Sequence, residues 1–160
     1  MNRREKDLYP EIKSWFNQYL CDRYPSYKVI TTCQTAKIAL DTFLKTLGIE
    51  AKEAIGLGIK IDIVGVLQKG KTVHLGFVEV KDRPLTLTDL GQLWGYTELI
   101  NPLESFLISS KGLGSLDYIL NVLKREDLLK YGIKQEKMMR ISKWDTTSKI
   151  LDSLSTIPKL

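Results

Sequence analysis

Apolar residues recur every three or four positions near the start of the chain, which is the spacing of one face of an α-helix. The residues with this spacing are Leu8, Ile12, Trp15, Phe16, Tyr19 and Leu20. They predict an amphipathic helix over residues 5–21. Similar stripes predict helices over residues 35–47, 89–100 and 116–130, which we expect to end near Gly48, at Asn101-Pro102 and at Gly132.

Short runs rich in β-branched residues predict the strands. These runs occupy residues 27–32, 59–66, 76–82, 106–109 and 137–142. A polar turn, Gln68-Lys69-Gly70-Lys71, joins two of them as a hairpin. Residues 49–58 are expected to form a loop or a helical turn, and the residues after 142 a surface helix or a tail. This order predicts an α/β protein with a mixed central β-sheet flanked by helices on both faces.

Composition narrows the class of protein. A length of 160 residues, 43% hydrophobic and 27% charged, is typical of one globular domain. No apolar run is long enough to span a membrane, and the first residues lack a signal peptide, so we expect a cytoplasmic protein without membrane association. Cys21 and Cys33 lack the spacing of a metal site. The net charge of +5 is compatible with a polyanionic partner without requiring one.

Two carboxylates interrupt the apolar runs of the hairpin: Asp62 in the first strand, and Glu79, two residues before Lys81, in the second. Buried carboxylates are costly unless they are paired or bind a metal. Alternation along the strand places Glu79 and Lys81 on one face and Val80 on the other. Asp62 would face the same place if the register allows it. Converging carboxylates suit Mg²⁺ or Mn²⁺, and a neighbouring lysine can hold a water, which favours phosphodiester hydrolysis.

These residues carry a family resemblance. Asp62 with Glu79-Val80-Lys81 resembles the motif of the PD-(D/E)xK nuclease superfamily, although Lys60-Ile61-Asp62 stands in place of the first Pro-Asp. Gln92-Leu93-Trp94-Gly95-Tyr96 resembles the Gln-x-x-x-Tyr motif of its RecB-like branch, and Glu11 is similar in placement to an N-terminal acid of many members. The resemblance covers about residues 8–110. It implies an αβββαβ restriction-endonuclease-like core in a single nuclease domain, residues 1–160, with a helical and strand extension over residues 111–160.

The resemblance also implies a role for each matching position. The metal ligands would be Asp62, Glu79 and the backbone carbonyl of Val80, with Glu11 reaching a second metal or a metal-bound water. Lys81 would orient or activate the attacking water. Gln92 and Tyr96, one helical turn apart, would contact the lysine, the water or a DNA phosphate. The implied cofactor is Mg²⁺, for which Mn²⁺ can substitute, and no organic cofactor is implied.

The implied function is that of a metal-dependent DNA nuclease. The short chain favours a stand-alone endonuclease, or a nuclease specific for junctions or other DNA structures, and a homodimer would allow two strands to be cut. The alternatives are a DNA exonuclease of RecB-like type and a non-catalytic nucleic-acid-binding module with the same fold. No recognition motif supports RNA as the substrate.

Structural interpretations remain open for the strand residues and for Glu11. Asp62 and Lys81 could form a cross-strand salt bridge at the end of the sheet. Glu79 could face solvent on a half-exposed strand. Glu11 flanks the apolar stripe of its helix, where charged side chains are usually solvated.

The helix residues have structural interpretations too. Asp89 and Gln92 fit an N-cap and its partner three positions later. Tyr96 could be an amphipathic tyrosine at the edge of the core. These interpretations need no ligand, so the position of each side chain relative to Asp62 and Glu79 decides between them.

Overall fold

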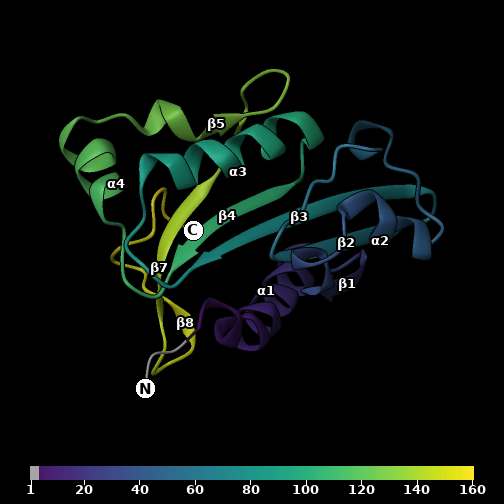
Figure 1. Ribbon diagram of the computed structural model, residues 1–160, viewed down its shortest axis with the longest axis horizontal. Coiled ribbons are helices and arrows are strands. Elements are labelled where there is room, and N and C mark those ends of the chain that lie inside the picture. Colours follow the sequence, from purple (N-terminus) through teal and green to yellow (C-terminus); the bar gives the residue numbers. More distant parts are fainter. Residues whose placement is uncertain (1–3) are drawn as a thin grey trace.

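The computed structural model describes residues 4–160 as an α/β protein with a mixed, curled six-stranded sheet flanked by helices (Figure 1). The strands, in their order across the sheet, are β1 (Lys28–Thr32), β2 (Ile63–Lys69), β3 (Thr72–Lys81), β4 (Glu104–Ser109), β7 (Arg140–Asp145) and β8 (Ile150–Leu151). Strands β1, β2 and β3 are antiparallel neighbours, β3, β4 and β7 are parallel, and β8 is antiparallel to β7. The expected mixed sheet with helices on both faces is therefore confirmed.

The remaining elements are short, apart from two longer helices. Among residues 4–160 the helical segments are η1 (Glu5–Leu8), α1 (Tyr9–Arg23), η2 (Gln34–Ala36), α2 (Leu40–Thr46), η3 (Lys52–Ala54), α3 (Leu87–Ile100), α4 (Ser115–Asp117), η4 (Tyr118–Val122) and η5 (Glu126–Leu129). Strands β5 (Lys130–Tyr131) and β6 (Lys137–Met138) form a separate pair. None of the helices in this part of the chain combines the length and the apolarity needed to cross a bilayer.

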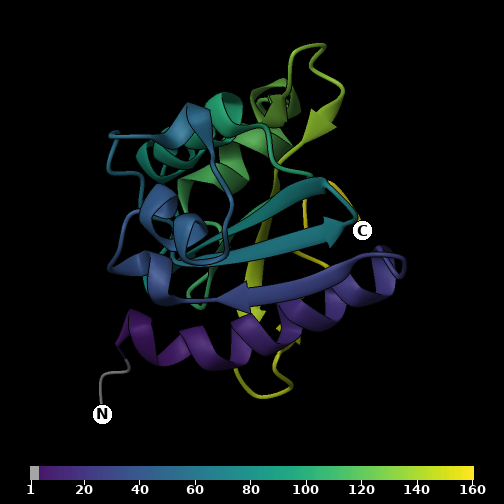
Figure 2. The ribbon, with the colours of Figure 1, turned by 90° about the vertical axis from the view of Figure 1, so that its right-hand side faces the viewer.

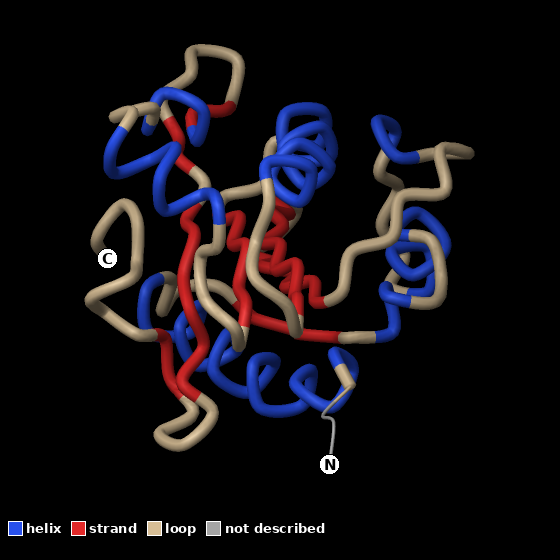
Figure 3. The backbone as a smooth tube through the Cα atoms, turned by 60° about the vertical axis from the view of Figure 1, so that its left-hand side comes forward, coloured by secondary structure: helices blue, strands red, loops and turns tan. Residues whose placement is uncertain are grey.

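The two faces of the sheet carry separate apolar cores, with the strands between the helical layers (Figure 3). Helix α1 covers one face, where its stripe packs against strand residues such as Val78, Val80 and Phe106. Figure 2 shows α1 running beside β1 on this side. Helices α2 and α3 cover the other face, which contains Phe77 and Leu107. Because side chains alternate along β3, Glu79 and Lys81 lie on the α3 side.

The glycines of β2 and β3 allow α1 to lie close against the sheet. A β-carbon added to Gly76 would lie 2.8 Å from Cζ of Phe16, which is buried. Gly65 is paired with Gly76 in the neighbouring strand, and a β-carbon there would meet Leu20. The close approach of α1 to the sheet therefore depends on both missing side chains.

The periodic segments agree with the sequence predictions over α1, β1, the β2–β3 hairpin and α3. Helix α3 ends at Asn101, whose φ of 58° is left-handed, as the Asn-Pro pair predicts. The loop over residues 49–58 contains the predicted helical turn, η3.

The predicted starts of the second helix and of the strand over residues 59–66 are wrong. The helix expected over residues 35–47 begins only at Leu40, because the carbonyl of Thr35 and the N–H of Leu40 bond the backbone of Ile61 and Ile59. The same bonds keep residues 59–61 out of the sheet, so β2 begins at Ile63 and Asp62 lies one residue before it.

The predicted helix over residues 116–130 is broken into α4, η4 and η5, with a left-handed residue, Lys124, between the last two. The predicted C-terminal helix or tail is also wrong. The Asp145 carboxylate accepts the N–H groups of Thr147 and Ser148, which forms a turn. The chain then returns as β8, and Ile157 bridges Ile141 of β7.

We expect Gly76→Ala to lower the free energy of unfolding by about 1–3 kcal/mol, because the new methyl overpacks the α1 interface. Gly91→Ala is the matched control, since Gly91 lies within α3 with open space around its missing β-carbon. It should raise stability by up to about 1 kcal/mol through helix propensity. Urea denaturation measures both changes, and equal effects would contradict close packing at Gly76.

Candidate metal centre

Asp62 and Glu79 meet where β2 begins and β3 ends. The antiparallel register pairs Ile63 with Val78. Asp62, which precedes Ile63, therefore lies beside Glu79, which follows Val78. Asp62 is 9% exposed, and the Glu79 side chain is 21% exposed. The hairpin thus brings together two largely buried carboxylates at one end of the sheet, as the sequence predicts.

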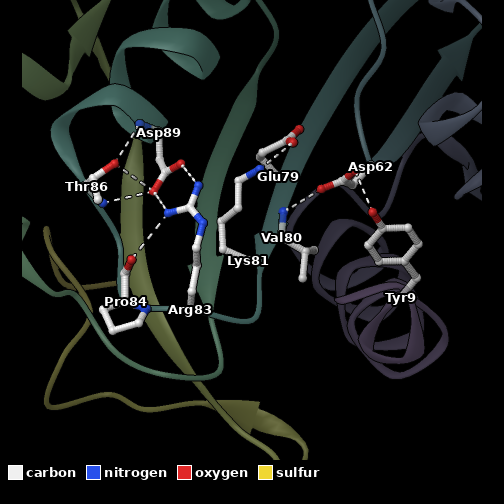
Figure 4. A network of polar contacts seen from close by, with 9 residues as sticks. All are labelled: Tyr9, Asp62, Glu79, Val80, Lys81, Arg83, Pro84, Thr86 and Asp89. Carbon is white, nitrogen blue, oxygen red and sulfur yellow. Dashed lines mark hydrogen bonds and ion pairs between the residues drawn. The ribbon is translucent and has the colours of Figure 1, made fainter. Parts of the chain in front are cut away.

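Both oxygens of Asp62 accept a hydrogen bond (Figure 4). The hydroxyl of Tyr9, the first residue of α1, donates to Oδ1 at 2.7 Å. The backbone N–H of Val80 donates to Oδ2 at 2.8 Å. Tyr9 was not singled out by the sequence, and it connects the helical layer to the hairpin.

Lys81 forms its ion pair with Glu79. The two side chains share the α3 side of β3, with Lys81 Nζ 3.6 Å from Glu79 Oε1 (Figure 4). Within residues 4–160, Lys81 therefore pairs with Glu79 and does not form the alternative salt bridge with Asp62. The alternative of a solvent-facing Glu79 is wrong as well, because most of that side chain is covered.

The pair of carboxylates carries more negative charge than its surroundings neutralise. Burial, and next the negative charge of Asp62, raise the pKa of Glu79 to about 8, while Lys81 opposes the shift. One ammonium thus offsets only part of the repulsion between the carboxylates. A bound divalent cation would remove the rest, which is an electrostatic reason for such an ion at this place.

Glu5 joins this cluster from η1, which contacts β3. Burial raises the pKa of Glu5, the charge of Lys81 acts against that rise, and the charge of Asp62 adds to it. The helical spacing of the sequence indicates that Glu5 lies on the same face as the apolar stripe. Glu5 lies three residues before Leu8, so it extends the buried stripe by one turn beyond its apolar start.

Glu11 takes a different position. Its Oε1 accepts a hydrogen bond from the indole of Trp144, at 2.8 Å, so the side chain lies against β7. The acidic side chains whose charges raise the pKa of Tyr9, next to the site, are Asp62, Glu5 and Glu79. Glu5 therefore interacts electrostatically with Asp62 and Lys81. Glu11 bonds Trp144, and its role at a metal remains a prediction.

Gln92 and Tyr96 lie on the exposed surface of α3, one turn apart. Within residues 4–160, no hydrogen bond or ion pair joins either side chain to Glu79 or Lys81. They share a face of the helix that follows the site, and their contact with lysine, water or phosphate remains a prediction.

The expected N-cap of α3 is wrong. The N-cap is Thr86, whose hydroxyl accepts the N–H of Asp89, and the Asp89 carboxylate accepts the N–H of Thr86 in return. Arg83 adds two bonds to Asp89, at 2.8 and 2.6 Å (Figure 4). Asp89 is therefore the third helical residue of a capping box, and Gln92 has no part in it.

The donor set fits a hard divalent cation. No group of three His, Cys, Asp or Glu side chains in the described residues 4–160 is arranged to hold a metal by itself. Two carboxylates are nevertheless the donors Mg²⁺ commonly uses, because it keeps several waters and takes its other ligands from substrate phosphates. Asp62 and Glu79 would hold the ion, and the Val80 carbonyl remains a predicted ligand.

No model of a known protein family matches this chain, and no curated protein matches its sequence significantly.

The raised pKa of Glu79 predicts a pH dependence of stability. Without metal, the folded chain holds a proton at Glu79 up to about pH 8, whereas the unfolded chain releases it near 4.5. The folded state binds more protons in this window, so the free energy of unfolding should fall as pH rises through it. Glu79→Gln cannot titrate and should lack this part of the decline. Urea denaturation in EDTA at about pH 5 and about pH 8.5 compares the two, and parallel profiles would refute the shift.

Proposed function

We propose that this protein is a metal-dependent nuclease that hydrolyses phosphodiester bonds in DNA and acts as an endonuclease. The observation that carries the proposal is the cluster at the end of β3. Two largely buried carboxylates lie side by side there, with a lysine on the same strand 3.6 Å from one of them. This combination supplies ligands for Mg²⁺ and a cation that can hold a water.

The order of the elements supports a restriction-endonuclease-like core. Helix α1, strands β1, β2 and β3, helix α3 and strand β4 follow one another in the order αβββαβ, with α2 between β1 and β2. The proposal is also supported by the order of the polar residues, since Asp62 precedes β2 and Glu79 and Lys81 lie at the end of β3.

In the proposed hydrolysis, each residue of the site has a separate role. A divalent cation, when bound, supplies Lewis-acid polarisation of the phosphodiester. Asp62, which directly precedes β2, and Glu79, near the end of β3, would hold the cation. The Lys81 ammonium, 16% exposed, has protons to donate beyond its ion pair and can orient a water toward phosphorus. The net charge of +5 favours approach of a polyanion to the chain.

Replacing the central residues should remove cleavage. We expect Asp62→Asn and Lys81→Ala each to reduce Mg²⁺-dependent DNA cleavage by at least about 100-fold, the scale of losing a group that acts directly in the reaction. Lys71→Ala, in the exposed turn at the opposite end of β3, is the matched control and should cleave normally. Gel assays with and without Mg²⁺, on circular and on linear DNA, measure the effect.

Those assays also separate the rival functions. Cleavage of circular DNA is expected of an endonuclease, and activity confined to linear DNA would indicate an exonuclease. Binding of DNA without cleavage by the wild-type chain would indicate a non-catalytic module. Unchanged cleavage by both Asp62→Asn and Lys81→Ala would defeat the proposed site.

The two N-terminal acids can be compared directly. Glu5→Gln should lower the cleavage rate because Glu5 acts electrostatically on Lys81 and Asp62. Glu11→Gln keeps an acceptor for the Trp144 indole and should change the rate much less. Initial rates at saturating Mg²⁺ test this difference. A larger loss with Glu11→Gln would mean that the sequence resemblance, and not the observed placement, identifies the functional acid.

A further inference from the structure

The orientation of Asp62 is determined by donors from two separate elements. Tyr9 donates to one oxygen from the start of α1, and the Val80 N–H donates to the other from β3. The two bonds, 2.7 and 2.8 Å long, hold both ends of the carboxylate (Figure 4). Each carboxylate oxygen has two lone pairs, so each keeps one that can bind a cation.

The Tyr9 hydroxyl is suited only to the role of donor here. A tyrosine hydroxyl has an ordinary pKa of about 10, and here it donates a hydrogen bond to the Asp62 carboxylate. The side chain therefore stays a neutral phenol in the physiological range and does not act as a base. Its effect on the site must pass through the carboxylate it holds.

We propose that Tyr9 is a positioning residue of the metal centre, which holds the Asp62 carboxylate in the orientation that binds the divalent cation. The inference rests on the proposed function, because it assumes that Asp62 is a metal ligand. Partners that hydrogen-bond a ligating carboxylate orient it, and their loss typically weakens metal binding or activity by about 10- to 100-fold.

A competing explanation is that Tyr9 only fastens α1 to the sheet. The other end of α1 has a bond of the same kind, in which the hydroxyl of Tyr24 donates to Oε1 of Glu104 at 2.6 Å. Glu104 is buried and also pairs with Arg23 and Arg140. Glu104 lies at the start of β4, which runs parallel to β3, so this bond is at the opposite end of the sheet from Lys81. Tyr24→Phe is therefore a matched control for Tyr9→Phe.

The experiment measures Mn²⁺ binding to the full chain by isothermal titration calorimetry, without DNA. The variants are Tyr9→Phe and Tyr24→Phe, and urea denaturation in EDTA gives the stability of each. We expect both to lose stability by similar amounts. Tyr9→Phe alone should also weaken Mn²⁺ binding, by about 10- to 100-fold relative to the wild-type chain.

Each other outcome overturns a defined statement. Mn²⁺ affinity that is unchanged in Tyr9→Phe, or weakened equally in Tyr24→Phe, would reduce Tyr9 to a fastening residue and leave the proposed nuclease standing. A wild-type chain that binds no Mn²⁺ would overturn both. A wild-type chain that cleaves no DNA, but whose Mn²⁺ affinity falls in Tyr9→Phe and not in Tyr24→Phe, would overturn the nuclease and keep the positioning role.

Discussion

The structure depends on the placement of two adjacent carboxylates in a largely buried position. Burying one unpaired charge costs several kcal/mol, and a second like charge beside it adds repulsion. The chain offsets this cost locally. Tyr9 and the Val80 N–H donate hydrogen bonds to Asp62, and Lys81 lies 3.6 Å from Glu79. The pKa of Glu79 is raised to about 8, so its neutral form is favoured where the ammonium does not offset the cost of charge. These compensations are partial, because one ammonium faces two carboxylates.

The sheet holds the side chains of Glu79 and Lys81 in fixed positions. Strand β3 pairs with β2 on one side and with β4 on the other, so its backbone is hydrogen-bonded along both edges near Glu79. Helix α1 packs on the face of Val80, and α3 lies over the face of Glu79 and Lys81. Groups on strands that are fixed on both edges and both faces hold their geometry better than groups on loops.

The sequence was sufficient to predict the elements whose signals are local. The stripe of α1 and the turn at Gly70 contain their own periodicity and turn chemistry, and the Asp62–Glu79 pairing follows from the hairpin. The start of α2 depends instead on bonds between Thr35, Leu40 and the segment before β2, which no local pattern shows.

The positions of Glu5 and Glu11 show the same limit of a local pattern. Glu5 and Glu11 both border the apolar stripe of one helix, and periodicity alone treats them alike. Their difference arises from docking, because the start of the helix meets the end of β3 whereas Glu11 meets Trp144 on β7. The sequence around Asp89 also fits an N-cap. The extended backbone at Thr86 shows that the N-cap lies three residues earlier.

The bonds at the two ends of α1 have a consequence for how this chain can vary. Tyr9 and Tyr24 are separated by about four helical turns, so both hydroxyls reach the sheet side of the helix. One inserted or deleted residue between them would rotate one end relative to the other by about 100° and break at least one of these bonds. Point changes on the outer face of α1 leave this spacing intact. The length of α1 is therefore more constrained than its composition, and length variation is better accommodated in the exposed turn at Gly70.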